Sequence, residues 1–145
     1  MTAAEDSAPV SVEMHDEVPV LTFESGLPGF SDLHRFSISP LEGDFPSFSR
    51  MTSLDRPEIA FVVTAPGLFF DDYFVEVDDP HQELLGLKDS SDVVVLVIVT
   101  LPRPPAPPTA NLLGPIVINR RTLQAAQVVQ HHTTLPVAAP FPKDR

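Results

Sequence analysis

The chain has 145 residues, the length of one ordinary domain, and its 20 acidic and 9 basic side chains give a formal net charge of -11. This charge repels phosphate backbones and anionic lipid headgroups, so we expect neither direct nucleic-acid binding nor membrane binding. The absence of cysteine excludes disulfides and thiolate metal sites. The N-terminus lacks the basic and then apolar pattern of a secretory signal, and we expect a cytoplasmic protein.

Short segments rich in β-branched and aromatic residues alternate with turn residues along the chain, which is typical of a β-protein. In chain order they predict strands over Val18–Phe23, Arg35–Ser39, Phe45–Met51, Ile59–Val63, Tyr73–Val77, Val93–Leu101, Asn111–Asn119 and Gln124–Gln130. The spacing predicts a mainly β fold, a small antiparallel β-barrel or sandwich-like domain. The apolar run from Val93 to Leu101 is too short for a membrane-spanning helix, which needs about 20 residues, and is expected to be a buried central strand.

Helix signals are few, and we expect one or two short helices. The clearest signal covers Asp79–Gly86, with Asp79 as the N-cap, Pro80 at the first helical position and Gly86 at the end. A single further helical turn is expected after Pro28.

The two ends of the chain differ in composition from its middle. We expect residues 1–16 to form a disordered acidic N-terminal tail, residues 17–135 to form the β domain, and residues 136–145 to form a proline-rich C-terminal tail. The connector Arg103–Pro108 resembles polyproline and is interpreted as a rigid loop, with a ligand for proline-binding modules as the alternative.

The sequence contains no pattern that indicates catalysis. There is no glycine-rich phosphate loop and no GxSxG nucleophile elbow. His131 and His132 are adjacent, but neighbours on a strand point to opposite faces, so one metal ion cannot easily bind both. We therefore expect no cofactor and no metal, and a protein that is not an enzyme.

Acidic pairs flank an aromatic segment near the middle of the chain, and this segment is the candidate partner-binding surface. Its residues are Phe70, Asp71, Asp72, Tyr73, Asp78 and Asp79. The carboxylates would steer a basic partner and the aromatic rings would give apolar contact. The alternative interpretation is that the acids only protect a strand edge and that the rings belong to the core. The residue pattern does not separate these two interpretations.

An ordered set of motifs resembles the flagellar assembly factor FliW family over about Val18 to His131. The set comprises Phe23–Phe30, Ile59–Val63, Asp72–Tyr73, Leu84–Leu87, Val97–Thr100, Asn111–Asn119 and Gln127–Val129. The family-motif residues interpreted as structural are Gly26, Pro28, Gly29, Phe30, Asn111, Pro115 and Asn119. The chain departs from the family pattern where Asp71 replaces a usual proline and where Arg103–Pro108 is unusually rich in proline.

The resemblance implies a small β-barrel-like protein that binds two partners in turn. One is the translational regulator CsrA, whose mRNA binding such a factor weakens without occupying the RNA surface. The other is flagellin, which the factor binds and protects, so that flagellin translation is coupled to secretion. The free protein would be a monomer. A small-metabolite- or carbohydrate-binding β-barrel is the alternative from another class, and a metal-dependent hydrolase using His131 and His132 is a third.

Overall fold

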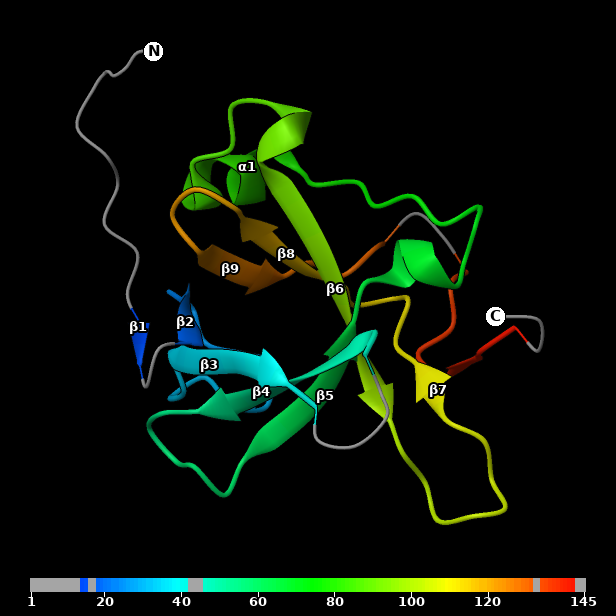
Figure 1. Ribbon diagram of the computed structural model, residues 1–145. Helices are drawn as coiled ribbons and strands as arrows, with labels where there is room; N and C mark the ends of the chain where they lie inside the picture. The colour runs from blue at the N-terminus through cyan, green and yellow to red at the C-terminus, as the bar shows by residue number, and fades with distance from the viewer. Residues whose placement is uncertain (1–13, 16–17, 42–45, 132–133, 143–145) are drawn as a thin grey trace.

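The computed structural model describes residues 14–15, 18–41, 46–131 and 134–142 (Figure 1). Its strands are β1 (Met14–His15), β2 (Val18–Phe23), β3 (Arg35–Pro40), β4 (Phe48–Ser53), β5 (Ala60–Thr64), β6 (Val93–Thr100), β7 (Thr109–Ala110), β8 (Ile116–Asn119), β9 (Gln124–Gln127) and β10 (Ala139–Pro140). One α-helix, α1 (Asp79–Leu85), and two 3-10 turns, η1 (Pro66–Leu68) and η2 (Ser90–Asp92), complete the described elements.

Seven strands close into a barrel in the order β6-β5-β4-β3-β2-β9-β8, because β8 also pairs with β6. The predicted mainly β fold is therefore confirmed. All pairings are antiparallel except that of β2 with β9, where Thr22 lies opposite Gln124 and Phe23 opposite Ala125. Outside this ring, β7 continues the sheet from β6 and β10 pairs with β7, while β1 forms a hairpin with β2 (Figure 1).

The long apolar run predicted as a central strand forms β6, which packs on both of its faces. Val94, Leu96 and Ile98 point into the barrel and contact its core. The alternate residues Val93 and Val97 point outward and contact two separate apolar clusters. This two-sided cover explains why the run is apolar at nearly every position instead of at every second one.

Three apolar clusters account for most of the buried side chains. The barrel core consists of Leu21, Phe23, Leu27, Leu33, Phe36, Met51, Val63, Ile116, Ile118 and Ala125. A second cluster lies between helix α1 and the outer face of β8 and β9, with Leu85, Val117 and Val128 buried in it. A third lies under the C-terminal segment, where Val97 and Leu112 are covered by Ala139 and Phe141.

The predicted helix is present, but its N-cap is one residue earlier than expected. Asp78, not Asp79, accepts a hydrogen bond from the backbone N–H of His81 at 2.9 Å. Gly86 ends the helix as predicted, with a left-handed φ of 65°. No described helix is long and apolar enough to span a membrane. The helical turn expected after Pro28 is not found, since the chain there makes a tight turn closed by hydrogen bonds between Leu27 and Phe30.

One predicted strand is wrong, and several others begin or end at different residues than predicted. Tyr73–Val77 is extended but has no strand partner among the described residues. Of the segment Asn111–Asn119, only Ile116–Asn119 is strand, because the Asn111 side chain accepts from two backbone N–H groups and folds a turn before Pro115. The strand predicted over Gln124–Gln130 ends at Gln127. The strand predicted from Phe45 begins at Phe48, and Phe45 itself lies outside the described residues.

Both predicted tails contain residues with defined pairing. Within the N-terminal tail, Met14 lies opposite Pro19 in β2, and residues 1–13 and 16 lie outside the described part of the chain. In the C-terminal tail, Ala139 lies opposite Ala110 in β7. Phe141 lies just after this pair in the chain. The centroid of its ring is 5.0 Å from that of Phe69 and 5.9 Å from that of Phe48. The C-terminal tail thus packs against the β domain over these residues.

Candidate interaction surface

Five of the six predicted partner-binding residues lie on a segment that crosses the outside of the barrel between β5 and α1, and the sixth, Asp79, is the first residue of α1. We call residues 65–78 the strap. It begins with η1, continues through the aromatic residues and ends at Asp78, the N-cap of α1. Along its second half the side chains alternate between half-buried and exposed, with Tyr73, Val75 and Val77 facing the protein and Phe74 and Glu76 facing solvent. The strap therefore has the side-chain pattern of a strand without a strand partner.

Side chains hold the strap in place. The Gln130 amide is 2 % exposed, and its Oε1 accepts from the Glu76 backbone N–H at 2.8 Å while its Nε2 donates to the Glu76 carbonyl at 3.0 Å. This pair of bonds imitates one rung of an antiparallel ladder. The Tyr73 hydroxyl donates to the Leu112 carbonyl at 2.6 Å, and the Gln82 Nε2 donates to the Val77 carbonyl at 2.7 Å. The sequence analysis did not predict this role of Gln130. The signal that could have indicated it is a single amide side chain at the end of an apolar run.

The two aromatic residues predicted to anchor a partner are partly used within the protein. Phe70 and Tyr73 are half-buried against the cluster that contains Val97 and Leu112. Burial also raises the pKa of the Tyr73 hydroxyl to about 12, so this group stays protonated and keeps donating its hydrogen bond at neutral pH. The exposed ring of the strap is instead Phe74, which is 81 % exposed.

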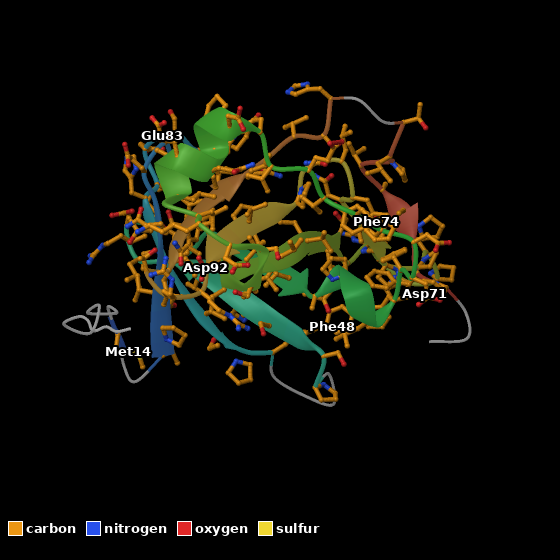
Figure 2. All side chains as sticks on the ribbon, turned by 90° about the horizontal axis from the view of Figure 1, so that it is seen from above. Met14, Phe48, Asp71, Phe74, Glu83 and Asp92 are labelled. Atoms are coloured by element: carbon orange, nitrogen blue, oxygen red, sulfur yellow. The ribbon has the colours of Figure 1, made fainter. Side chains whose placement is uncertain are left out.

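The predicted acidic residues form two pairs, one in the middle of the strap and one where the strap meets α1. Asp71 and Asp72 are exposed beside Phe74, whereas Asp78 and Asp79 are exposed at the start of α1. Figure 2 shows Asp71 and Phe74 at one side of the molecule, well separated from the helix that carries Glu83. The pKa of the Asp78 carboxyl is lowered because it accepts from the backbone N–H and then from the ring of His81. The two acidic pairs are thus separated by a stretch in which half-buried apolar side chains alternate with exposed Phe74 and Glu76.

Two open grooves flank the strap. The larger, which we call the β6 groove, has a volume of about 560 Å³ and separates the strap from the outer face of β6, where Val93 and Val95 line it. Its other walls include Pro66, Phe74 and Lys88. The smaller groove of about 360 Å³ lies between Asp71 and Asp72 on the strap and Leu135 and Pro142 of the C-terminal segment. Tyr73 lines both grooves, and both lie on the outside of the barrel.

The family-motif glycines lie in turns, away from the strap. Gly26 has a φ of 69°, and a Cβ added there would lie 2.7 Å from the Ser31 backbone, so no other residue fits without movement. Gly29 has a φ of 84° in the same turn, next to exposed Pro28 and half-buried Phe30.

The C-terminal motif residues form caps and turns. The buried Asn119 donates from Nδ2 to the Leu85 carbonyl at the end of α1 and accepts at Oδ1 from the Arg121 N–H. The Pro115 carbonyl accepts from the Val128 N–H. Together with the Asn111 turn, these contacts connect the helix, β8 and the segment after β9.

No group of three metal-binding side chains occurs among the described residues. His131 is exposed, and its neighbour His132 lies outside the described residues. One charged contact that the sequence reasoning missed joins Arg121 Nε to Asp92 Oδ1 at 3.0 Å. This ion pair connects the start of β6 to the turn after β8.

Residues 5–141 match the family model described as FliW protein. The protein named flagellar assembly factor FliW from Bacillus velezensis is 40% identical over 116 residues, covering 80% of this chain and 80% of the relative. The protein of the same name from Bacillus subtilis is 39% identical over 125 residues, covering 86% and 87%.

A more distant relative and a solved structure agree with these matches. The flagellar assembly factor FliW of Treponema pallidum is 36% identical over 118 residues, covering 81% of this chain and 75% of the relative. A crystal structure of a flagellar assembly factor FliW superposes with a TM-score of 0.80 at 32% identity, covering 92% of this chain and 93% of that one.

Proposed function

The chain belongs to the FliW family of flagellar assembly factors, and we propose that it is a non-enzymatic regulator that binds two proteins in turn in the cytoplasm. The first is a CsrA-type translational regulator, whose mRNA binding it antagonises without competing for the RNA surface. The second is flagellin, which it binds and protects until secretion. Competition between the two partners then couples flagellin translation to flagellin secretion.

The observation that carries this proposal beyond the family name is the exposed Phe74 ring within an acidic surface. A phenyl ring that is 81 % exposed beside the carboxylates of Asp71 and Asp72 suits a partner with an apolar patch surrounded by Lys or Arg. An RNA-binding protein has such basic surfaces, because it must attract phosphates. The net charge of -11 would in addition repel an mRNA approaching the same complex.

The barrel interior is already filled by side chains of its own, among them Phe23, Phe36 and Met51, each 0 % exposed. The two grooves beside the strap lie on the outer surface and are open to solvent. An open surface groove suits a protein segment better than a small metabolite, which proteins enclose over most of its area. These observations favour the protein-binding function over the alternative of a metabolite-binding barrel.

The proposal is tested by calorimetric titration of this protein with the CsrA of its own organism, repeated after saturation with monomeric flagellin. Binding of CsrA that flagellin abolishes supports the exchange of partners. Absence of heat with both partners, for protein shown to be folded, contradicts the proposal.

The placement of the binding surface is tested by Phe74→Ala. We expect this variant to lose about tenfold or more in affinity for at least one partner without losing stability, because removing an exposed ring at an interface costs binding energy only. The matched control is Val137→Ala, which truncates a side chain 62 % exposed in the C-terminal segment. Equal affinities of the two variants and the wild-type protein would place the interface elsewhere.

The acidic contribution is tested by reversing two charges, in the variant Asp71→Lys with Asp72→Lys. We expect weaker binding at low salt and a smaller dependence of the affinity on ionic strength, because exposed charges are screened by salt. Unchanged affinity at low salt would show that these carboxylates do not contact the partner.

A further inference from the structure

The β6 groove borders a stretch of β6 that has no strand beside it. On one side, β6 pairs with β8 from Val93 to Leu96. On the other side, β5 pairs only with Val97, Ile98 and Val99. The first half of β6 therefore has an open edge on the β5 side, among the residues that the structure describes. An open edge with unpaired backbone groups accepts an added strand.

Pro66 explains why the pairing of β5 with β6 stops. Thr64 lies opposite Val97, and continuing this antiparallel register would place residue 66 opposite Val95 as the next hydrogen-bonded pair. Proline has no N–H to donate to the Val95 carbonyl. The Pro66 carbonyl, in turn, accepts from the N–H groups of Phe69 and Phe70. The chain thus leaves the barrel at Pro66 and begins the strap.

The backbone N–H and C=O groups without a described strand partner belong to Val95, because successive residues of a strand direct these groups to opposite sides. The Ile98 carbonyl accepts from the Asn111 N–H, on the side of β6 where β7 and β8 lie. Every second residue of a strand directs its N–H and C=O groups to the same side, so Val94 and Leu96 direct theirs toward β8. Val95 directs its N–H and C=O to the opposite side, toward the β6 groove that its side chain also lines. Within the described residues neither group has a hydrogen-bond partner. The N–H of Val93, by contrast, is satisfied by the Ser90 carbonyl.

The opposite wall of the groove has a related property. Tyr73–Val77 is extended and alternates in exposure, yet it belongs to no sheet among the described residues. The groove is thus bounded by an open strand edge on one wall and by a strand-like segment on the other. Its lining is mostly apolar, with Val75, Val77 and Leu87 facing Val93 and Val95.

We propose that the β6 groove binds an extended segment of a partner protein, which adds to the open edge of β6 beside Val95. This inference rests on the proposed function, since the strap forms one wall of the same groove. Exposed carboxylates at Asp72, Glu76 and Asp78 lie next in sequence to the strap residues that line the groove. The charged residues of the lining itself are Lys88 and Asp89, so the acidic strap gives the mouth of the groove a negative balance. The occupant is therefore a segment in which apolar residues alternate with Lys or Arg.

Amide hydrogen exchange of the full chain, resolved by NMR, tests the open edge directly. In the free protein at low concentration, we expect the Val95 amide to exchange at least about tenfold faster than the amides of Val94 and Leu96, which bond to β8. Exchange of Val95 as slow as that of its neighbours would overturn the inference. If slow exchange appears only as the protein concentration rises, a second copy occupies the edge and the inferred partner is wrong.

The binding step is tested with a synthetic ten-residue peptide that alternates valine and lysine. Saturating peptide is expected to slow exchange of the Val95 amide about tenfold or more. The control peptide alternates valine and glutamate and is expected to leave exchange unchanged. No protection by the lysine peptide, or equal protection by both peptides, overturns the inferred chemistry of the occupant.

Two proline variants distinguish the loss of peptide binding at the open edge of β6 from unfolding of the protein. Val95→Pro removes an N–H that makes no ladder bond, and is expected to fold and to lose the peptide. Val94→Pro removes an N–H that bonds to β8, and is expected to unfold at much lower denaturant concentration. If Val95→Pro is as destabilised as Val94→Pro, the Val95 N–H is not free. Phe74→Ala, with its backbone unchanged, then provides a folded variant of the same groove whose peptide affinity is expected to fall.

The same exchange measurement with CsrA and with flagellin distinguishes this inference from the proposed function. Binding of either partner without protection of Val95 contradicts the added strand and leaves the proposed function intact. Protection of Val95 by the peptide, with no binding of either partner, supports the added strand and contradicts the proposed function.

Discussion

The barrel wall and the strap are both extended chain, but different groups hold them. In the barrel wall, from β2 round to β8, backbone hydrogen bonds join each strand to a neighbour on either side. The strap is fixed chiefly by side chains, with Gln130 bonded to Glu76 and Tyr73 bonded to Leu112. Side-chain attachment leaves backbone and ring surfaces of the strap available. A β-protein can therefore present a strand-like surface when one extended segment is left out of the sheet.

The largest loss of stability is expected when a side chain of the barrel core is truncated. Phe36 is 0 % exposed, and its ring lies 5.4 Å from that of Phe23 and 6.2 Å from that of Phe61. Phe36→Ala is expected to lower the free energy of unfolding by about 3–5 kcal/mol, through lost burial and the cavity left behind. Equilibrium denaturation in urea measures this change.

The strap provides the matched comparison for that variant. Leu68 is 52 % exposed in η1, and Leu68→Ala is expected to change the free energy of unfolding by no more than about 0.5 kcal/mol. Similar losses from both substitutions would show that the strap contributes to the cooperative core.

An intermediate effect is expected at the attachment of the strap. Gln130→Leu keeps the side-chain size but leaves the part-buried Glu76 backbone groups without these bonds, at a cost of about 1–3 kcal/mol. Amide exchange over Tyr73–Val77 is expected to accelerate more than exchange in the barrel strands. Denaturation and exchange together measure both effects.

The control for Gln130 is Gln124→Leu, at a half-buried glutamine for whose side chain the structure describes no hydrogen bond. It is expected to leave stability and exchange nearly unchanged. If Gln130→Leu accelerates exchange equally in the barrel and the strap, the strap does not move independently of the barrel.

The smallest of these three losses of stability is expected at the N-cap of α1, where the strap ends, and its size depends on pH. The folded-state pKa of Asp78 lies below its ordinary value of 3.8, so its contribution to stability is present above that value and disappears as the pH falls through the folded pKa. Asp78→Ala is therefore expected to be less stable than the wild-type protein at neutral pH and equally stable in strong acid. Unfolding measured between neutral and strongly acidic pH tests this.

Asp79→Ala is the control for the pH experiment, because it removes a neighbouring carboxylate that does not cap the helix. Its effect on stability is expected to be smaller than that of Asp78→Ala at every pH. A larger loss of stability in Asp79→Ala than in Asp78→Ala would indicate that Asp79 caps the helix, as predicted from the sequence.

Local signals predicted the parts of this fold that depend on neighbouring residues. Pro80 and Gly86 marked the helix within one residue at its start, and the β-branched run marked β6. The error at Asp78 and Asp79 arose because either aspartate can cap a helix whose first turn contains Pro80. The strand predicted at Tyr73–Val77 had the correct side-chain alternation and lacked only a partner. The candidate surface was predicted from its charges and stays a prediction. The exposed ring on it is Phe74, because the burial of Phe70 and Tyr73 depends on Leu112 and Phe141, far along the chain.

The sequence by itself determined the chemistry of the protein: its acidic surface, its β-rich composition, the ends of its helix, and the set of motifs that identifies its family. Tertiary structure alone decided which extended segments became strands and which side chains remained exposed. The parallel pairing of β2 with β9 and the contact of Gln130 with Glu76, 54 residues apart, join distant segments. Such contacts form only when the whole barrel closes, because a backbone hydrogen bond needs a partner and no local pattern specifies where that partner lies.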